Sequence, residues 1–417
     1  MNGALSPAKA ALLDMLATAR PVSTSGLAQL SPTDWDSLAD SAQQHRLGPI
    51  LDHRCRTAGA DWPVPPAIRQ QWAASHRAAA LRSLKLQQTI RKLADCLNAA
   101  HIPFAVLKGG WLAWHAYPQA ALRPMRDIDV WVGPELVEQA QDLLLAAGFS
   151  PCPMPGPSLE AALEHEKHLP PLQLPGLGIA VEIHQRTYHI EDRSEAAQLA
   201  EDVPGLKDRM ITHQLGDAAV GYLSPTDTLL HLIVHAAYDH RFNNGPVVID
   251  DIACLLAHHP IDWPGFWQRA AAFGWSKGCH LALALAAYQH GPQPVEWPPE
   301  GQLPVPDALR DHALALCLQD FAERGTTAFF AQAREARTPA ALAAMVRHRF
   351  TASRDDLAAA AGLTESSRFY WLGYPAWLAG RAFKAGRQLT NRAVHHDAAR
   401  LADVAGWLEA DSSGPPR

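Results

Sequence analysis

The stretch HIPFAVLKGGWLAWHAYPQAALRPMRDIDVWV, residues 101–132, decides the fold of this chain. It opens with an apolar run, residues 102–107, that ends at Lys108-Gly109-Gly110. This pattern predicts a buried strand followed by a tight turn. A short helix is expected over residues 111–117, and a second strand over residues 127–132. Two short apolar strands joined through a turn and a helix indicate the start of a small sheet.

The segments that follow extend this sheet. A helix is expected from Glu135 to Ala147, with Gly148 placed as its C-terminal cap. Two further strand-like runs, residues 169–174 and 179–184, flank a Pro-Gly-Leu-Gly turn, which predicts a hairpin.

Both flanks of the sheet region carry helical patterns. Apolar residues recur at three- and four-residue steps over residues 68–100, and helices are expected at about 225–239, 246–258, 263–273 and 276–290. The proline-rich residues 291–306 indicate a linker, and the rest of the chain again favours helix. The predicted fold class is therefore α+β and mostly α, with a small mixed β-sheet core flanked by N- and C-terminal helical regions.

Composition limits the class of protein. The 417 residues are 48% hydrophobic and 19% charged, which is typical of a globular chain, and the net charge of -6 gives no general attraction to nucleic acid or anionic membrane. The six cysteines are isolated in sequence, which argues against a disulfide framework or zinc ribbon. We see no secretory signal and no apolar run of the roughly 18 residues that span a bilayer, so we expect a cytoplasmic protein without membrane insertion.

Asp127 and Asp129 are the first candidates for chemistry. Side chains alternate along a strand, so residues two apart point to the same face. Two carboxylates held close together repel each other unless a cation lies between them, and magnesium binds through such carboxylates and substrate phosphates. The glycines of Lys108-Gly109-Gly110 would let backbone N–H groups approach a phosphate at the start of a helix. The Walker A pattern is absent.

A third carboxylate lies in another apolar run, Ala180-Val181-Glu182-Ile183-His184. Alternation turns Glu182 away from its apolar neighbours and puts His184 on the same face as Glu182. We therefore expect the carboxylates of Asp127, Asp129 and Glu182 to converge.

At these residues the chain resembles the nucleotidyltransferases of the DNA polymerase β-like superfamily, and more narrowly the bacterial family of uncharacterised nucleotidyltransferases. The shared order is a glycine turn, an Asp-x-Asp pair on a strand and a third carboxylate on a later strand. The resemblance covers roughly residues 30–290. It is carried by IPFAVLKGG (102–110), YPQAALRPMRDIDVWV (117–132), VEIHQ (181–185), LSPTDTLLHLIVHA (223–236), VIDDIACL (248–255) and Ile261-Asp262-Trp263. The interval from Gly110 to Asp127 is longer than is usual in the superfamily, and the turn is Gly-Gly rather than Gly-Ser.

The resemblance implies roles for these residues. Asp127, Asp129 and Glu182 would be catalytic and would hold two Mg2+ ions, or Mn2+, with Glu182 completing the second site. Gly109 and Gly110 would bind phosphates through backbone N–H groups. Nucleotide binding would also involve Lys108, Arg123 and Arg126, for which surface ion pairs are the alternative. The regions would be an N-terminal helical region (1–100), a nucleotidyltransferase core (101–222), a helical substrate-binding region (223–290), and a linker with a C-terminal helical region (291–417).

Further polar residues are candidates for a substrate pocket: His184, His235, Asp250 and Asp251. His184 either orients a carboxylate or contacts substrate. His231 and His235 lie four apart on one helix, with Asp239 at the next such step, and a packing face with satisfied polar groups remains the alternative.

A basic segment, residues 376–400, contains five arginines and lysines against one aspartate, a balance of five minus one, or +4. It could touch an anionic acceptor, nucleic acid or a membrane surface, or be an amphipathic helix with a solvated basic face.

The leading hypothesis is a magnesium-dependent transferase that moves NMP from an NTP, with ATP the expected nucleotide, to a hydroxyl or phosphate of a small molecule, peptide or protein. A tailoring enzyme of peptide or polysaccharide biosynthesis would fit. One alternative is a phosphotransferase on the same fold, and another is a toxin-type nucleotidyltransferase that modifies tRNA, although nucleic acid is not the favoured partner. A non-catalytic module is disfavoured because all three carboxylates are present.

Overall fold

The computed structural model describes residues 5–57, 61–153, 159–188, 203–335, 338, 340, 347, 351–352, 354–363, 367–389 and 391–410. Over these residues the chain is mostly helical and contains one mixed sheet of seven strands, so the predicted α+β class is confirmed.

The sheet has the strand order β3-β4-β5-β2-β1-β7-β6. Its parallel pairs are β2 with β5 and β1 with β7, and the remaining neighbours are antiparallel. The strands are β1 (Ala105–Val106), β2 (Asp127–Trp131), β3 (Ser150–Pro151), β4 (Leu172–Gln173), β5 (Ala180–His184), β6 (Ile211–Leu215) and β7 (Ala218–Tyr222).

Most of the sheet follows the sequence pattern. Strands β1 and β2 lie within the runs predicted around 102–107 and 127–132, and β4 and β5 form the predicted hairpin, with Leu172 opposite Val181. The hairpin of β6 and β7 was not predicted. Its two-residue connection contains Gly216 at φ +69°, a left-handed conformation that glycine adopts without steric cost.

Helices surround the sheet. The helices before β1 are α1 (Pro7–Leu16), α2 (Thr24–Ala28), α3 (Pro32–Gln44), α4 (Gly48–Thr57) and α5 (Pro66–Ala99). Those within the sheet region are α6 (Gly109–His115), α7 (Val137–Ala146) and α8 (Leu159–His165). Later come α10 (Pro225–Val234), α11 (Val247–His258), α12 (Trp263–Ala272), α13 (Ser276–His290), α14 (Asp307–Cys317), α15 (Arg324–Glu335), α17 (Arg354–Ala360), α18 (Tyr374–Leu389) and α19 (Arg392–Glu409).

Two helix boundaries differ from expectation in ways that matter for the site. Helix α6 begins at Gly109, so the predicted glycine turn is the first turn of the helix. The helix expected over 225–239 is α-helical only to Val234 and ends in a π-helical turn, His235–Asp239. Such turns widen the backbone ring by one residue and are frequent at functional sites.

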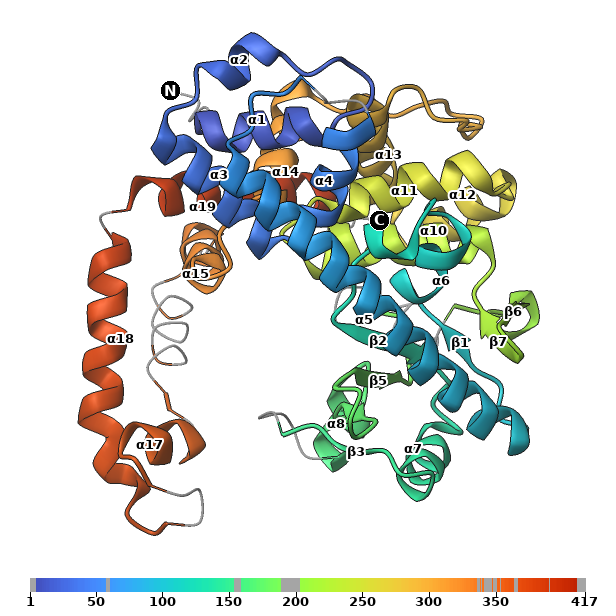
Figure 1. Cartoon of the computed structure of the whole chain (residues 1–417). Coiled ribbons are helices and arrows are strands. Elements are labelled where there is room, and N and C mark those ends of the chain that lie inside the picture. The colour runs from blue at the N-terminus through green and yellow to red at the C-terminus, as the bar shows by residue number, and fades with distance from the viewer. Residues whose placement is uncertain are drawn as a thin grey trace.

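The helical regions before and after the sheet pack against each other. Figure 1 shows α1, α3 and α4 beside α13, α14 and α19 on one side of the molecule, with the sheet on the other. The N–H groups of Thr18 and Ala19 donate to the carbonyl of Gln289 at 2.8 and 3.0 Å. Buried hydrophobic residues from Ala8 to Leu408 form one continuous cluster. The N- and C-terminal helical regions therefore share a core.

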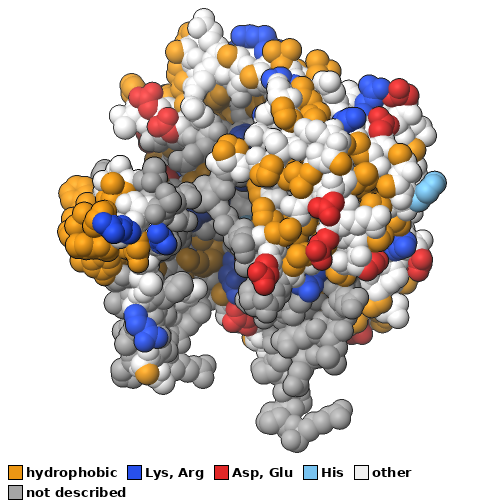
Figure 2. Space-filling model, turned by 90° about the horizontal axis from the view of Figure 1, so that it is seen from below, with side chains coloured by type: hydrophobic (Ala, Val, Ile, Leu, Met, Phe, Trp, Pro, Cys, Tyr) orange, Lys and Arg blue, Asp and Glu red, His pale blue; other side chains and the backbone are white. Residues whose placement is uncertain are grey.

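The basic segment is divided between two helices. Helix α19 packs against α14 and α15, whereas α17 and α18 lie apart from the main body (Figure 1). Trp371, just before α18, is 58% exposed, and Phe383, within α18, is 75% exposed. Figure 2 shows hydrophobic and basic side chains together on this protruding part, at the left of the view. No helix in the described part of the chain has the length and apolarity needed to cross a membrane.

Candidate functional site

Three carboxylates project from the two central parallel strands. The register of β2 and β5 places Asp129 beside Glu182 and Trp131 beside His184. The intervening Val130 and Ile183 are fully buried, so alternation turns the acidic side chains to the opposite face. Asp127, two residues before Asp129, lines the same cavity as the other two acids. We call Asp127, Asp129 and Glu182 the acidic cluster.

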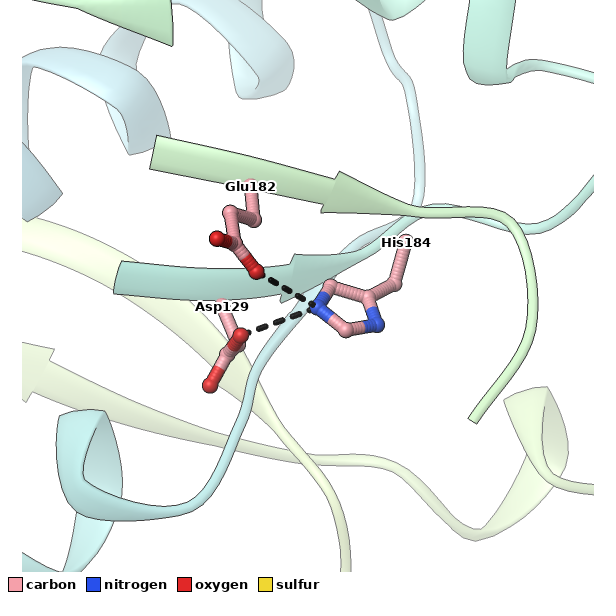
Figure 3. A group of neighbouring side chains, drawn as sticks. All are labelled: Asp129, Glu182 and His184. Atoms are coloured by element: carbon pink, nitrogen blue, oxygen red, sulfur yellow. Dashed lines mark hydrogen bonds and ion pairs between the residues drawn. The ribbon is translucent and has the colours of Figure 1, made fainter. Parts of the chain in front are cut away.

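Figure 3 shows Asp129 and Glu182 pointing toward the ring of His184. The His184 Nε2 lies 2.9 Å from Asp129 Oδ1 and 3.9 Å from Glu182 Oε2. One ligand atom from each of these three residues lies within 4.8 Å of the other two. Asp127 does not belong to this close group. The structure thus brings Asp129 and Glu182 together most closely and adds His184 to them.

Lys108 supplies positive charge on the other side of Asp129. Its Nζ lies 3.1 Å from Asp129 Oδ2, and both side chains are largely buried. Lys108 has φ +48° and ψ -123°, a region that non-glycine residues rarely adopt. Such a conformation costs about 1–3 kcal/mol and persists only where the surrounding structure holds it. Asp129 is therefore clamped between Lys108 and His184.

The charges of the cluster are not balanced. Burial, and then the neighbouring Asp129, raise the pKa of Asp127 and of Glu182. Burial acts in the same direction on Asp129, but Lys108 and His184 hold the pKa of Asp129 well below its usual value. Burial lowers the pKa of His184 to about 4. For Asp127 and Glu182, burial and the charge of Asp129 outweigh the cations nearby, so their charged forms are not fully compensated.

This donor set fits a hard divalent cation. Carboxylate oxygens from two adjacent strands are the ligands that Mg2+ and Mn2+ prefer. His184 could offer nitrogen, but its Nε2 is already within hydrogen-bond distance of Asp129 Oδ1. An imidazole in that position orients a ligating carboxylate.

The acidic cluster opens into a cavity of about 460 Å³. This volume lies in the range of small-molecule sites, roughly 300–1,000 Å³. The walls come from the turn after α3, the Gly-Gly turn, β2, β5, the π-helical turn, α11 and the start of α15. A larger cavity, about 900 Å³, lies between α12, α13 and residues 296–304, but no residue of the acidic cluster lines it.

The two glycines are required by close packing. A Cβ atom on Gly110 would lie 2.3 Å from Val106 Cγ1, and one on Gly109 would lie 2.6 Å from Met125 Sδ. The N–H of Gly110 donates to the Leu107 carbonyl at 3.0 Å. In this structure that N–H is engaged within the chain, although it was expected to contact a phosphate.

Arg123 is engaged by Asp251. Its Nε and Nη2 donate to the two carboxylate oxygens at 2.7 and 2.8 Å, and the hydroxyl of Tyr117 donates to the same carboxylate at 2.8 Å. Both Arg123 and Asp251 line the cavity, but most of their hydrogen-bonding capacity is used on each other. They join the segment before β2 to α11.

Asp250 lies apart from the other predicted residues. It lines a separate cavity of about 680 Å³ beside α4, and its Oδ1 lies 3.2 Å from His290 Nε2. Because adjacent residues on a helix point in different directions, Asp250 and Asp251 face different cavities.

The π-helical turn brings His235 to the cavity. Two residues that were not predicted, Lys167 and His168, also lie there. His235 Nδ1 lies 3.1 Å from Asp239 Oδ2, and the Lys167 ammonium lies 2.7 Å from the same oxygen. His168 forms an isolated bridge with His184 of β5, and both Lys167 and His168 line the cavity. Their place next to a predicted strand was the one sequence signal for them.

Two arginines of the cavity were also missed. Arg46 lies in the turn between α3 and α4, and Arg324 is the first residue of α15. Neither belongs to a recognisable motif, and both reach the cavity only through packing of segments far from β2 in sequence.

The sequence of the chain places it in a known protein family. Residues 31–289 match the family described as an uncharacterised nucleotidyltransferase, a match that spans more than half of the 417-residue chain. The chain belongs to this family, and its general activity is nucleotidyl transfer from a nucleoside triphosphate. No curated protein matches the chain.

Proposed function

We propose that this protein is a metal-dependent transferase that moves NMP from an NTP, with ATP the expected nucleotide, to a hydroxyl or phosphate acceptor. The observation that carries the proposal is the register of β2 and β5, which sets Asp129 beside Glu182 at the wall of a cavity that Asp127 also lines. Three carboxylates in such an arrangement suit in-line displacement at phosphorus.

The acidic cluster would hold Mg2+, which would neutralise phosphate charge and lower the pKa of the acceptor hydroxyl. Lys108 and His184 would fix the Asp129 carboxylate between them. Lys108 would remain within reach of phosphate oxygens because its side chain lines the cavity. In phosphoryl transfer, a protein contributes mainly by holding charged groups in position before the reaction begins.

The acceptor oxygen would form a bond to the α-phosphorus while the bond to the bridging oxygen breaks, so that pyrophosphate leaves. The acceptor proton needs a base. Asp129 is occupied by Lys108 and His184, whereas Glu182 is free of short contacts, with His168 at 3.7 Å and His184 at 3.9 Å. Of these two neighbouring carboxylates, Glu182 is the one we assign to this proton.

The test uses ATP labelled at the α- or γ-phosphorus, with Mg2+ and a cell extract as the source of acceptor. We expect α-label to enter the acceptor and pyrophosphate to be released. Asp129→Asn should reduce transfer on the order of a thousandfold, because metal ions supply several kcal/mol of transition-state stabilisation. The exposed Asp142 on α7 offers a matched control, Asp142→Asn, which should leave transfer unchanged.

Label that enters the acceptor only from the γ-position would replace this proposal with a phosphotransferase. Full activity of Asp129→Asn would reject the metal assignment. Mass spectrometry of the labelled product identifies the acceptor, which we expect to be a small molecule, a peptide or a protein.

A further inference from the structure

The positive side chains that line the cavity fall into two groups. Three of them are paired with a lining carboxylate. These pairs are Lys108 with Asp129, Arg123 with Asp251, and Lys167 with Asp239. The second group is Arg46, Arg126 and Arg324, which we call the arginine group. Among the residues that the structure describes, no hydrogen bond or ion pair engages the guanidinium of any of these three.

Arg324 shows the lack of a partner most clearly. Its Nε and Nη2 atoms are buried and have no hydrogen-bond partner. The flat face of its guanidinium lies 3.8 Å from the centre of the Phe321 ring, which holds the side chain in place. A buried cationic donor without a partner is costly, so its occurrence in a native structure calls for an anion.

Arg126 repels the other two arginines of the group. Burial, and then the charge of Arg126, lower the pKa of Arg46 to about 10. The same two causes lower the pKa of Arg324 to about 10. Arg46 and Arg324 therefore remain positively charged at neutral pH. Like charges gathered at one cavity wall are unfavourable unless the cavity receives a compensating negative charge.

The position of the group indicates which anion it takes. Arg126 directly precedes Asp127, so the arginine group adjoins the acidic cluster where the α-phosphorus would react. The other cations of the cavity are already paired, and the Gly110 N–H already donates to Leu107. A guanidinium binds phosphate oxygens through two parallel hydrogen bonds, which makes arginine the residue best suited to a polyphosphate.

We propose that Arg46, Arg126 and Arg324 form the subsite that binds the β- and γ-phosphates of the nucleoside triphosphate. This inference rests on the proposed function. It adds Arg46 and Arg324 to the residues that bind the nucleotide. Because Arg324 lies outside the matched family region, the segment after residue 289 would also contribute to nucleotide binding. The pyrophosphate that leaves would be released from the same three side chains.

The test measures binding of inorganic pyrophosphate, tripolyphosphate and AMP by calorimetry, with Mg2+ and with EDTA, at fixed ionic strength. These probes need no knowledge of the base or of the acceptor. Arg46→Gln and Arg324→Gln should each weaken pyrophosphate and tripolyphosphate about ten- to a hundredfold, as expected for lost charge-assisted hydrogen bonds, and should change AMP much less. The exposed Arg334 on the same helix gives the matched control, Arg334→Gln, which should bind like the wild type.

The melting temperature without ligand distinguishes binding from folding. Because Arg126 repels both side chains, Arg46→Gln and Arg324→Gln should melt at the wild-type temperature or above it, and should lose the stabilisation that pyrophosphate gives the wild type. Wild-type affinity of both variants for pyrophosphate, or an equal loss of AMP and pyrophosphate binding, would overturn the subsite. If the variants weaken pyrophosphate but the wild type transfers no nucleotide, the subsite stands and the proposed function fails.

Discussion

At the scale of single residues, the contact between Lys167 and Asp239 differs from an ordinary surface ion pair. The two side chains are 9% and 5% exposed. The Asp239 Oδ2 that contacts Lys167 also lies within hydrogen-bond distance of His235 Nδ1. Removing one partner of a buried pair leaves the other charge without compensation. The pair therefore stabilises the wall of the cavity and fixes His235 beside the acidic cluster.

Asp239→Asn should lower the free energy of unfolding at neutral pH by about 3–5 kcal/mol, the range for broken buried pairs. Although burial raises the pKa of Asp239, the hydrogen bond with His235 and the charge of Lys167 hold it well below its usual value. A carboxyl with a depressed folded-state pKa contributes stability above its unfolded pKa, about 3.9, and that contribution is lost as pH falls further. Urea titrations of both proteins from pH 7 down to about 2 should show their difference shrinking below about pH 4. A difference that stays constant over this range would contradict the assignment.

At the scale of elements, strand β1 and helix α6 meet so closely that position 110 has no room for a side chain. Gly110→Ala places a Cβ atom against Val106 Cγ1, and we expect it to cost about 1–3 kcal/mol, as overpacked cores do. In a Val106→Ala background the added cost should be smaller, so a double-mutant cycle should give a clear coupling energy. Gly380 on α18, with no atom within 4 Å of its would-be Cβ, is the control, and Gly380→Ala should be neutral or stabilising. A Gly110→Ala protein as stable as the wild type would show that this contact is not tight.

The elements also show what the sequence can predict. Asp127, Asp129 and Glu182 were placed on one face because strand alternation is a local property of two residues. The residues from other parts of the chain that surround this face could not be predicted in the same way. Arg46 and Arg324 are separated from β2 by most of the helical regions, and only tertiary packing brings them to the cavity. The hairpin β6–β7 was missed because its alternation is weak, with polar His213 and Gln214 next to Leu215.

At the scale of the whole molecule, the family match and the folded unit differ in extent. The match covers residues 31–289, but α1 lies before it and α14, α15 and α19 lie after it. These outer helices bury residues such as Leu12, Met15 and Leu316 completely. The N–H of Phe321 also donates to the Gln44 side chain, which ties the start of α15 to the end of α3.

A chain limited to residues 31–289 should therefore fail to fold cooperatively. Each fully buried large apolar side chain contributes about 1.5–3 kcal/mol, so the loss of several of them is comparable with the 5–15 kcal/mol that typically separates folded from unfolded domains. Circular dichroism should show a broad or much lower melting transition than that of the full chain. A sharp transition at the full-chain temperature would mean that the outer helices are additions to a self-sufficient core. Even then the fragment should bind tripolyphosphate more weakly, because it lacks Arg324, and that measurement separates the role of the C-terminal helices in the site from their role in the core.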